Sequence, residues 1–238
     1  MIRLGGLDLT VDAYRIHIRN QLGLSENIAA TASPQVAALL NPLGVSAARF
    51  FINGIATTAR GIDGVAHYRL RSGGAGTFDF TVAGNLNDID VTRVPTSTSV
   101  LNPAPTLFAR SRILTIEQGT PREKVTGTLD WSLGDVGTTA RVTYYGNVTQ
   151  PGTTATILVN GVPISNDLQT GKKAIADLEL RYAPAKGVQV AFGASNLLDT
   201  YPKKAPAYLN TTGVTAFPFY SPFGFNGRFL YARAGLNW

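Results

Sequence analysis

The side chains able to do acid–base or metal chemistry are few in this sequence. It contains 2 His and no Cys, so disulfides, thiolate nucleophiles and zinc–thiolate sites are all excluded. His17 and His67 each lack a second residue at the spacing that a zinc site or a general-base pair requires. The Gly-x-Ser-x-Gly arrangement of a serine nucleophile is absent as well. The sequence therefore predicts no enzyme, no catalytic residue, no metal site and no cofactor.

Two groups of carboxylates have a chemical and a structural interpretation. Asp88 and Asp90 stand at the end of a predicted strand and could hold a cation through their oxygens, but a solvated strand end is the favoured interpretation. Asp177, Glu179 and Arg181 share one face of another predicted strand. Because the cationic Arg181 shares this face with the two carboxylates, ion pairing is favoured there over acid–base catalysis.

A stretch near the C-terminus concentrates aromatic side chains in a predicted loop. Its members are Tyr201, Tyr208, Phe217, Phe219, Tyr220, Phe223 and Phe225. Packing within the loop, together with an interfacial aromatic girdle, is the favoured interpretation. The alternative is a vestibule that stacks on a ligand, and its candidate ligand-facing residues are Tyr208, Phe217, Phe219 and Tyr220. Pro218 and Pro222 stiffen the loop in either case.

Composition bounds the kind of protein that could position these residues. The chain has 238 residues, 44% of them hydrophobic, and a mean hydropathy of +0.06, which is enough apolar material for a core or a wall. The formal charge is +6, yet Lys and Arg are scattered along the sequence and do not form a continuous basic run, so no nucleic-acid partner is expected. No apolar run approaches the roughly 18 residues of a membrane-spanning helix, so any membrane insertion must be by strands. The first residues lack a secretory signal, so a mature form or a fragment is expected.

Alternating apolar and polar residues predict about eight strands. The first begins at Leu7, and the others lie at about 48–72, 77–91, 122–133, 140–145, 174–182, 188–194 and 227–238. Long connections are expected at 22–47, 92–120, 149–171 and 196–226. The second of these is expected to contain a short helical or extended piece at about 107–117. Short turns are expected at 5–6, 73–76, 134–137 and 184–187. Strict alternation of long and short connections is typical of an antiparallel transmembrane β-barrel with long outer loops and short periplasmic turns.

Charged residues fall opposite the apolar face in most of these strands, as expected when a lysine or arginine facing lipid costs roughly 2–4 kcal/mol. The set comprises Arg69, Asp79, Lys124, Asp130, Arg141, Asp177, Glu179, Arg181 and Arg233. The first strand departs from the rule, because Arg15, His17 and Arg19 share parity with Leu7 and Leu9. A bulge near Tyr14, or emergence from the membrane there, would explain this departure.

Four stretches carry a resemblance to a known family: LTVDAYRIHI at 9–18, FFINGIATTARGIDGVAHYRL at 50–70, FGASNLLDTYP at 192–202 and SPFGFNGRFLYARAGLNW at 221–238. The chain resembles the C-terminal barrel portion of TonB-dependent receptors of Gram-negative outer membranes. The most specific match is Asn-Leu-Leu-Asp followed by Tyr-Pro and a closing strand that ends in Trp. The resemblance implies a segment of a 22-stranded barrel over 1–238, with no counterpart of the plug domain, TonB box or signal peptide.

The resemblance also implies roles for particular residues and partners. Tyr231, Arg233, Leu236 and Trp238 fall where the family keeps the signal read by the outer-membrane assembly machinery. Asn196, Leu197 and Asp199 belong to the family motif, with an expected structural role. The expected function is a part in energised uptake of a scarce nutrient, such as a siderophore, cobalamin or a carbohydrate. Its partners would be outer-membrane lipid and, through the missing N-terminal part, TonB.

Two alternatives stay open at this stage. A self-contained eight-stranded outer-membrane barrel would serve as an adhesin or a structural protein, with its interior filled by side chains. A soluble lipocalin-like binder would show the same strand alternation but would not need every second loop to be long.

Overall fold

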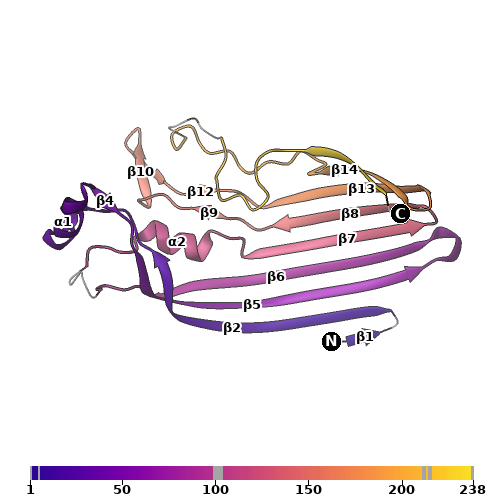
Figure 1. The fold of residues 1–238 in the computed structure, drawn as a ribbon, viewed down its shortest axis with the longest axis horizontal. Helices are drawn as coiled ribbons and strands as arrows, with labels where there is room; N and C mark the ends of the chain where they lie inside the picture. Colours follow the sequence, from indigo (N-terminus) through magenta and orange to yellow (C-terminus); the bar gives the residue numbers. More distant parts are fainter. Residues whose placement is uncertain (1, 5, 99–103, 211–212, 214–215, 237–238) are drawn as a thin grey trace.

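The computed structural model describes residues 2–4, 6–98, 104–210, 213 and 216–236 of the chain. Its main feature is a nine-stranded sheet of antiparallel neighbours in the order β1-β2-β5-β6-β7-β8-β13-β14-β15 (Figure 1). The strands are β1 (Ile2–Leu4), β2 (Leu7–Leu24), β5 (Phe51–Arg71), β6 (Thr77–Arg93), β7 (Glu123–Leu133), β8 (Val136–Tyr145), β13 (Lys173–Ala185), β14 (Val188–Ser195) and β15 (Phe229–Leu236). The predicted all-β antiparallel fold is confirmed, with the short β1 added to the eight expected strands.

The sheet is an open, curved stretch of wall. Within the described residues, β1 pairs only with β2 and β15 pairs only with β14, so these two strands are its edges. No helix in the described ranges is long and apolar enough to cross a membrane.

Short and long connections lie at opposite ends of the strands, as predicted (Figure 1). The long connections contain the helices α1 (Pro34–Leu40) and α2 (Arg110–Gln118), the latter close to the expected piece at 107–117. They also contain the strand pairs β3 (Ile28–Ala29) with β4 (Ala47–Ala48), β9 (Thr149–Gln150) with β12 (Leu168–Gln169), and β10 (Thr156–Val159) with β11 (Val162–Ser165). Single 3-10 turns occupy Ala30–Ala32, Asn41–Leu43 and Gly73–Ala75.

One face of the sheet is apolar and runs in register across the strands. One row of cross-strand neighbours reads Phe80, Leu129, Ala140, Leu178, Ala194 and Leu230. Large side chains on this face are far more exposed than core residues: Val82 is 50% exposed, Leu180 52% and Leu230 68%. A contiguous exposed apolar surface of this kind suits contact with hydrocarbon.

The opposite face is polar, and every member of the predicted charged set lies on it. One row there reads Arg69, Asp79, Asp130, Thr139, Glu179, Gly193 and Tyr231. Arg69 Nε donates to Asp79 Oδ1 at 2.6 Å, and Arg181 pairs with Glu179 at 3.3 Å. The expected ion pairing is therefore confirmed for Glu179 and Arg181, whereas Asp177 Oδ1 accepts a hydrogen bond from Asn196 N at 2.8 Å.

The register of β2 decides between the two explanations of its irregular parity. Leu7 to Ile18 pair with β5 without a break, and the register shifts only beyond Ile18. Arg15 lies opposite Arg60, which in turn lies opposite Asp88, so neighbouring strands become charged at the same level. Because β2, β5 and β6 have 18, 21 and 17 residues, they are longer than the roughly 9–11 residues that span a bilayer. Emergence from the apolar band explains the pattern, and a bulge at Tyr14 does not.

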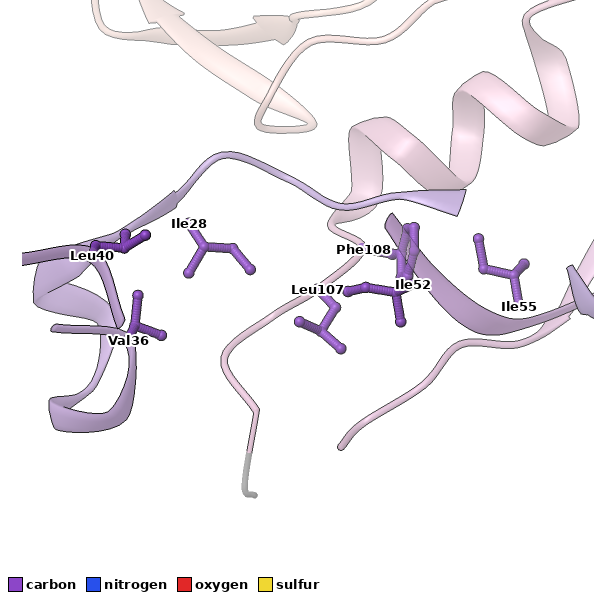
Figure 2. Packing of buried hydrophobic residues seen from close by; sticks show 7 residues of the cluster. All are labelled: Ile28, Val36, Leu40, Ile52, Ile55, Leu107 and Phe108. Atoms are coloured by element: carbon purple, nitrogen blue, oxygen red, sulfur yellow. The ribbon is translucent and has the colours of Figure 1, made fainter. Parts of the chain in front are cut away.

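The outer connections have a hydrophobic core of their own, which the sequence did not predict. Ile28, Val36, Leu40, Ile52, Ile55, Leu107 and Phe108 are buried together (Figure 2). They come from the connection after β2, the first residues of β5 and the connection after β6. Two long loops are thus packed against the outer end of β5 as one folded unit. Helix α1 begins at a capped end, where Ser33 Oγ accepts from Val36 N at 3.2 Å.

Candidate ligand-facing loops and wall contacts

Helix α2 joins the outer connections to one another. Its Ser111 Oγ donates to Glu26 Oε1 at 3.2 Å, in the connection after β2. Its Thr115 Oγ1 lies 3.3 Å from the hydroxyl of Tyr220, in the connection before β15. Gln150, after β8, accepts from Phe219 N at 2.6 Å through its side-chain oxygen. The loops are therefore held by specific polar contacts between segments distant in sequence.

The strongest of these contacts is a bidentate ion pair between Arg110 and Asp167. Arg110 Nη1 donates to Asp167 Oδ1 at 2.9 Å and Nη2 to Oδ2 at 2.6 Å. Gly152 N adds a third hydrogen bond to Oδ1 at 3.0 Å. The hydrogen bonds from Arg110 lower the pKa of the Asp167 carboxyl, against the opposing effect of partial burial. The same hydrogen bonds raise the pKa of the Arg110 guanidinium, so the pair is fully charged at neutral pH.

The aromatic residues of the last connection form a stack. Phe217 lies against Tyr201 with ring centroids 5.4 Å apart and against Phe225 at 6.3 Å. Phe219 meets Phe225 edge-on at 6.5 Å. Offset and edge-on pairs of this kind stabilise a loop by about 0.5–1.5 kcal/mol each beyond burial. Phe217 is thus a packing residue of the loop.

The other three candidate ligand-facing residues are accessible. Phe219 is 61% exposed, Tyr208 39% and Tyr220 37%. Phe223, from the same connection, contacts Tyr145 at 5.5 Å, and Lys124 Nζ lies 5.4 Å from the centre of that tyrosine ring. Because Tyr145 and Lys124 are cross-strand neighbours on the polar face, the loop bends over that face of the wall.

The family motif forms a tight turn between β14 and the last loop. Asn196 and Asp199 both have left-handed backbone conformations, with φ of 50° and 56°. The Asn196 side chain closes the turn by accepting from Thr200 N and donating to Thr200 O, each at 2.8 Å. Asp199 Oδ1 accepts from Arg228 N at 2.8 Å, just before β15. Leu197 N donates to Ala176 O at 2.6 Å. The contacts of Asn196 and Asp199 join the end of β14 to the start of β15, and that of Leu197 attaches the turn to β13.

The predicted assembly-signal residues fall on both faces of β15. The Tyr231 hydroxyl donates to Glu179 Oε2 at 2.9 Å, and Arg233 Nη2 donates to Glu179 Oε1 at 2.7 Å. Both contacts reach across β14, because Tyr231 lies directly over Gly193. Leu236 pairs with Val188 on the apolar face and is 65% exposed. Trp238 lies outside the described residues.

The two histidines and the Asp88 and Asp90 carboxylates have side-chain partners within the wall. His17 Nδ1 lies 2.9 Å from Thr58 Oγ1, and His67 Nε2 lies 3.2 Å from Asp79 Oδ1. Asp88 and Asp90 both pair with Arg60, at 3.1 and 3.0 Å. In the parts of the chain that the structure describes, no group of three or more His, Asp or Glu residues could hold a metal ion.

Comparison with known proteins shows to which family this chain belongs. The model of the TonB dependent receptor-like, β-barrel family matches residues 2–197. The chain belongs to that family. Receptors of this family are outer-membrane proteins of Gram-negative bacteria, and the family is one of receptors and transporters rather than enzymes. No curated protein matches the sequence.

Solved structures agree with this membership at the level of the fold. The FrpB iron transporter from Neisseria meningitidis superposes with a TM-score of 0.58 at 12% identity, covering 98% of this receptor chain and 29% of its own. A mutant ferric enterobactin receptor from Pseudomonas aeruginosa gives 0.55 at 16% identity, with the same coverage of 98% and 29%. The copper transporter OprC gives 0.55 at 13% identity, again with 98% and 29% covered. The receptor chain thus spans less than a third of the length of these proteins.

Sequence reasoning missed the residues that hold the outer loops together. Arg110 and Asp167 are 57 positions apart, and Ser111 and Glu26 are 85 apart. No periodicity or motif links residues at such separations. The one local signal was the helical piece expected at 107–117, which contains Arg110 and Ser111.

Proposed function

We propose that this chain is the C-terminal wall, closing strand and outer-loop portion of a TonB-dependent receptor that takes up a scarce nutrient. The observation that carries the proposal is the division of one sheet into a continuous apolar face and an ion-paired polar face, with folded loops at one end only. Such a wall separates hydrocarbon from a polar interior.

In this proposal, residues 1–238 form one partial barrel domain, and the plug domain and the contact with TonB belong to the rest of the receptor. The short turns face the periplasm and the loops that contain α1 and α2 face outward (Figure 1). Tyr231, Arg233, Leu236 and Trp238 are read by the barrel assembly machinery. Asn196, Leu197 and Asp199 shape the turn that brings β15 back to β14.

The proposed cargo is a metal ion or a metal chelate, with Tyr208, Phe219 and Tyr220 as its outer contacts. Two observations support this choice: these aromatic side chains are exposed above the polar face, and structural neighbours are described as transporters or receptors for copper, iron and ferric enterobactin. Aromatic rings suit the flat organic part of a chelate better than a bare ion.

The membrane arrangement can be tested by cysteine accessibility, because residues 1–238 contain no Cys to give background. Single Cys residues would replace Leu158 in the β10–β11 hairpin, Gly74 in a short turn and Val82 on the apolar face. In cells, an impermeant maleimide should label L158C at once, G74C only after permeabilisation, and V82C in neither case. Equal labelling of L158C and G74C in intact cells would reject the orientation, and rapid labelling of V82C by the aqueous reagent would reject the membrane wall.

Cargo recognition needs a separate measurement. Ferric enterobactin and Cu²⁺ would be titrated against the chain in detergent, with quenching of intrinsic fluorescence as the signal. The F219A/Y220A variant should lose the response, whereas F80A, on the apolar face of β6 near a short turn, should retain it. A response that survives F219A/Y220A would refute the assignment of these aromatic contacts.

A further inference from the structure

The apolar face of the sheet becomes basic beyond the membrane band. On β2 this face carries Leu7, Leu9, Val11 and Ala13 and then Arg15, His17 and Arg19. The unbroken pairing of Leu7 to Ile18 with β5 keeps the first six of these residues on one side of the sheet. The change from apolar to basic is therefore a change of height, from hydrocarbon to the region outside it.

The first charged level has its own acidic partners. Arg60 pairs with Asp88 at 3.1 Å and with Asp90 at 3.0 Å. Arg122 also reaches Asp88, at 3.1 Å. Arg15 lies opposite Arg60 as a third arginine beside these two aspartates, so a net charge of only +1 is left at this level to attract an external anion.

The next level away from the apolar band is different. It begins in the row of His17, Thr58 and Asp90, but the Asp90 carboxylate is paired with Arg60 at 3.0 Å. A hollow of about 430 Å³ opens there, lined by His17, Arg19, Thr92 and Arg93 with Gly54 and Ala56. None of the described residues that line it is acidic. Within the described part of the chain, the ion pairs involve neither Arg19 nor Arg93. We call His17, Arg19 and Arg93 the basic rim.

Two irregularities in the sheet bring the basic rim together. The pairing of β2 with β5 shifts between Ile18 and Gln21, where Asn20 has φ of 54°. The pairing of β5 with β6 shifts as well, so that Thr57 faces Val91 while Ala56 faces Arg93. The residue left over on β6 is Thr92, whose hydroxyl donates to Ala56 O at 3.2 Å. Bulges of this type redirect side chains, and here they aim two arginines from strands on either side of β5 at one hollow.

The height of the hollow indicates which anion it suits. At roughly 3.3 Å per residue and a tilt of about 45°, His17 and Arg19 lie about 9–14 Å beyond the level of Ala13. The headgroup layer of a phospholipid bilayer is only about 5–8 Å deep on each side. A glycerophospholipid phosphate would lie below the basic rim, whereas a phosphate on an extended sugar headgroup would lie level with it.

We propose that the basic rim binds a phosphate group on the saccharide headgroup of a glycolipid in the outer leaflet. The inference goes beyond nutrient uptake and rests on the proposed membrane orientation of the wall. The planar guanidinium groups of Arg19 and Arg93 match two edges of a phosphate, and His17 adds a hydrogen-bond donor when its Nε2 carries the proton. The site lies on the outer side of the wall, opposite the face over which the aromatic loop bends.

The test measures lipid binding by the full chain in detergent micelles, using native mass spectrometry. The probes are a lipopolysaccharide with phosphorylated inner-core sugars, the same glycolipid after phosphatase treatment, phosphatidylglycerol and inorganic phosphate. Each arginine near an anionic headgroup strengthens binding about fivefold. R19Q and R93Q should therefore each weaken binding of the phosphorylated glycolipid about fivefold, and R19Q/R93Q about 25-fold. K203Q/K204Q, which removes the same charge from the last loop, should bind as the natural chain does.

Several outcomes would overturn the proposal. Binding that is equal in R19Q/R93Q and in the natural chain would remove the basic rim as the site. Equal binding of phosphatidylglycerol would remove the height argument, and displacement of the glycolipid by inorganic phosphate would indicate a free-anion site. Cysteine labelling of V82C on the same preparation separates these failures from failure of the membrane wall itself.

Discussion

Replacement of Gly193 by Ala tests how the closing strand is attached to the wall. Gly193 lies opposite Tyr231, and a Cβ built there would overlap the far end of the tyrosine ring. Because a side chain, and not the backbone, is in the way, Tyr231 can swing aside. The expected cost is therefore the loss of its contacts rather than a distortion of the sheet.

The lost contact that matters most is the hydrogen bond from the Tyr231 hydroxyl to Glu179 Oε2, at 2.9 Å. A hydrogen bond to a charged acceptor contributes about 1.5–3 kcal/mol. Because water reaches the polar face, we expect the lower part of this range, about 1.5–2 kcal/mol. Glu179 keeps its pair with Arg233, at 2.7 Å, so its charge is not left alone.

The assay is urea unfolding of the chain in detergent micelles, followed by heat-modifiable migration on gels. G193A and Y231F should lower the free energy of unfolding by similar amounts, and the double variant should cost less than their sum because both remove the same bond. G235A on β15 is the matched control, since nothing lies within 4 Å of a Cβ placed there. Additive effects of G193A and Y231F, or an equal loss in G235A, would refute the reasoning.

Three further outcomes are expected. The Arg110–Asp167 pair stabilises the outer loops at and above the ordinary pKa of an Asp carboxyl, and this stabilisation is lost as the pH falls through the lowered pKa of Asp167. Limited proteolysis of the outer loops should therefore accelerate in that acidic window for the natural chain. For R110Q it should be faster at every pH. G61A should destabilise the wall more than G193A, because a Cβ there meets the main-chain oxygen of Leu86, and urea unfolding measures the difference. L40A should lower the stability of the loop core by about 2–5 kcal/mol while leaving wall strands protected in hydrogen exchange.

The amino-acid sequence by itself determined the eight main strands, the faces of most of them and their order of connection. Period-2 alternation is a local property of the backbone, so the charged face and the short turns follow from parity and from Gly-rich breaks. The family, too, is visible in short stretches such as the Asn-Leu-Leu-Asp motif at 196–199.

Tertiary structure decided what depends on neighbours in other strands and loops. The register of β2 on β5 was needed to show that Arg15 marks emergence from the apolar band, because a strand's own sequence does not state where lipid ends. The core around Leu40 and Phe108 and the link from Arg110 to Asp167 join segments whose separation leaves no periodic signal. The basic rim exists only because two shifts of register turn Arg19 and Arg93 toward one hollow, and a shift between strands is a property of their pairing, not of either strand alone.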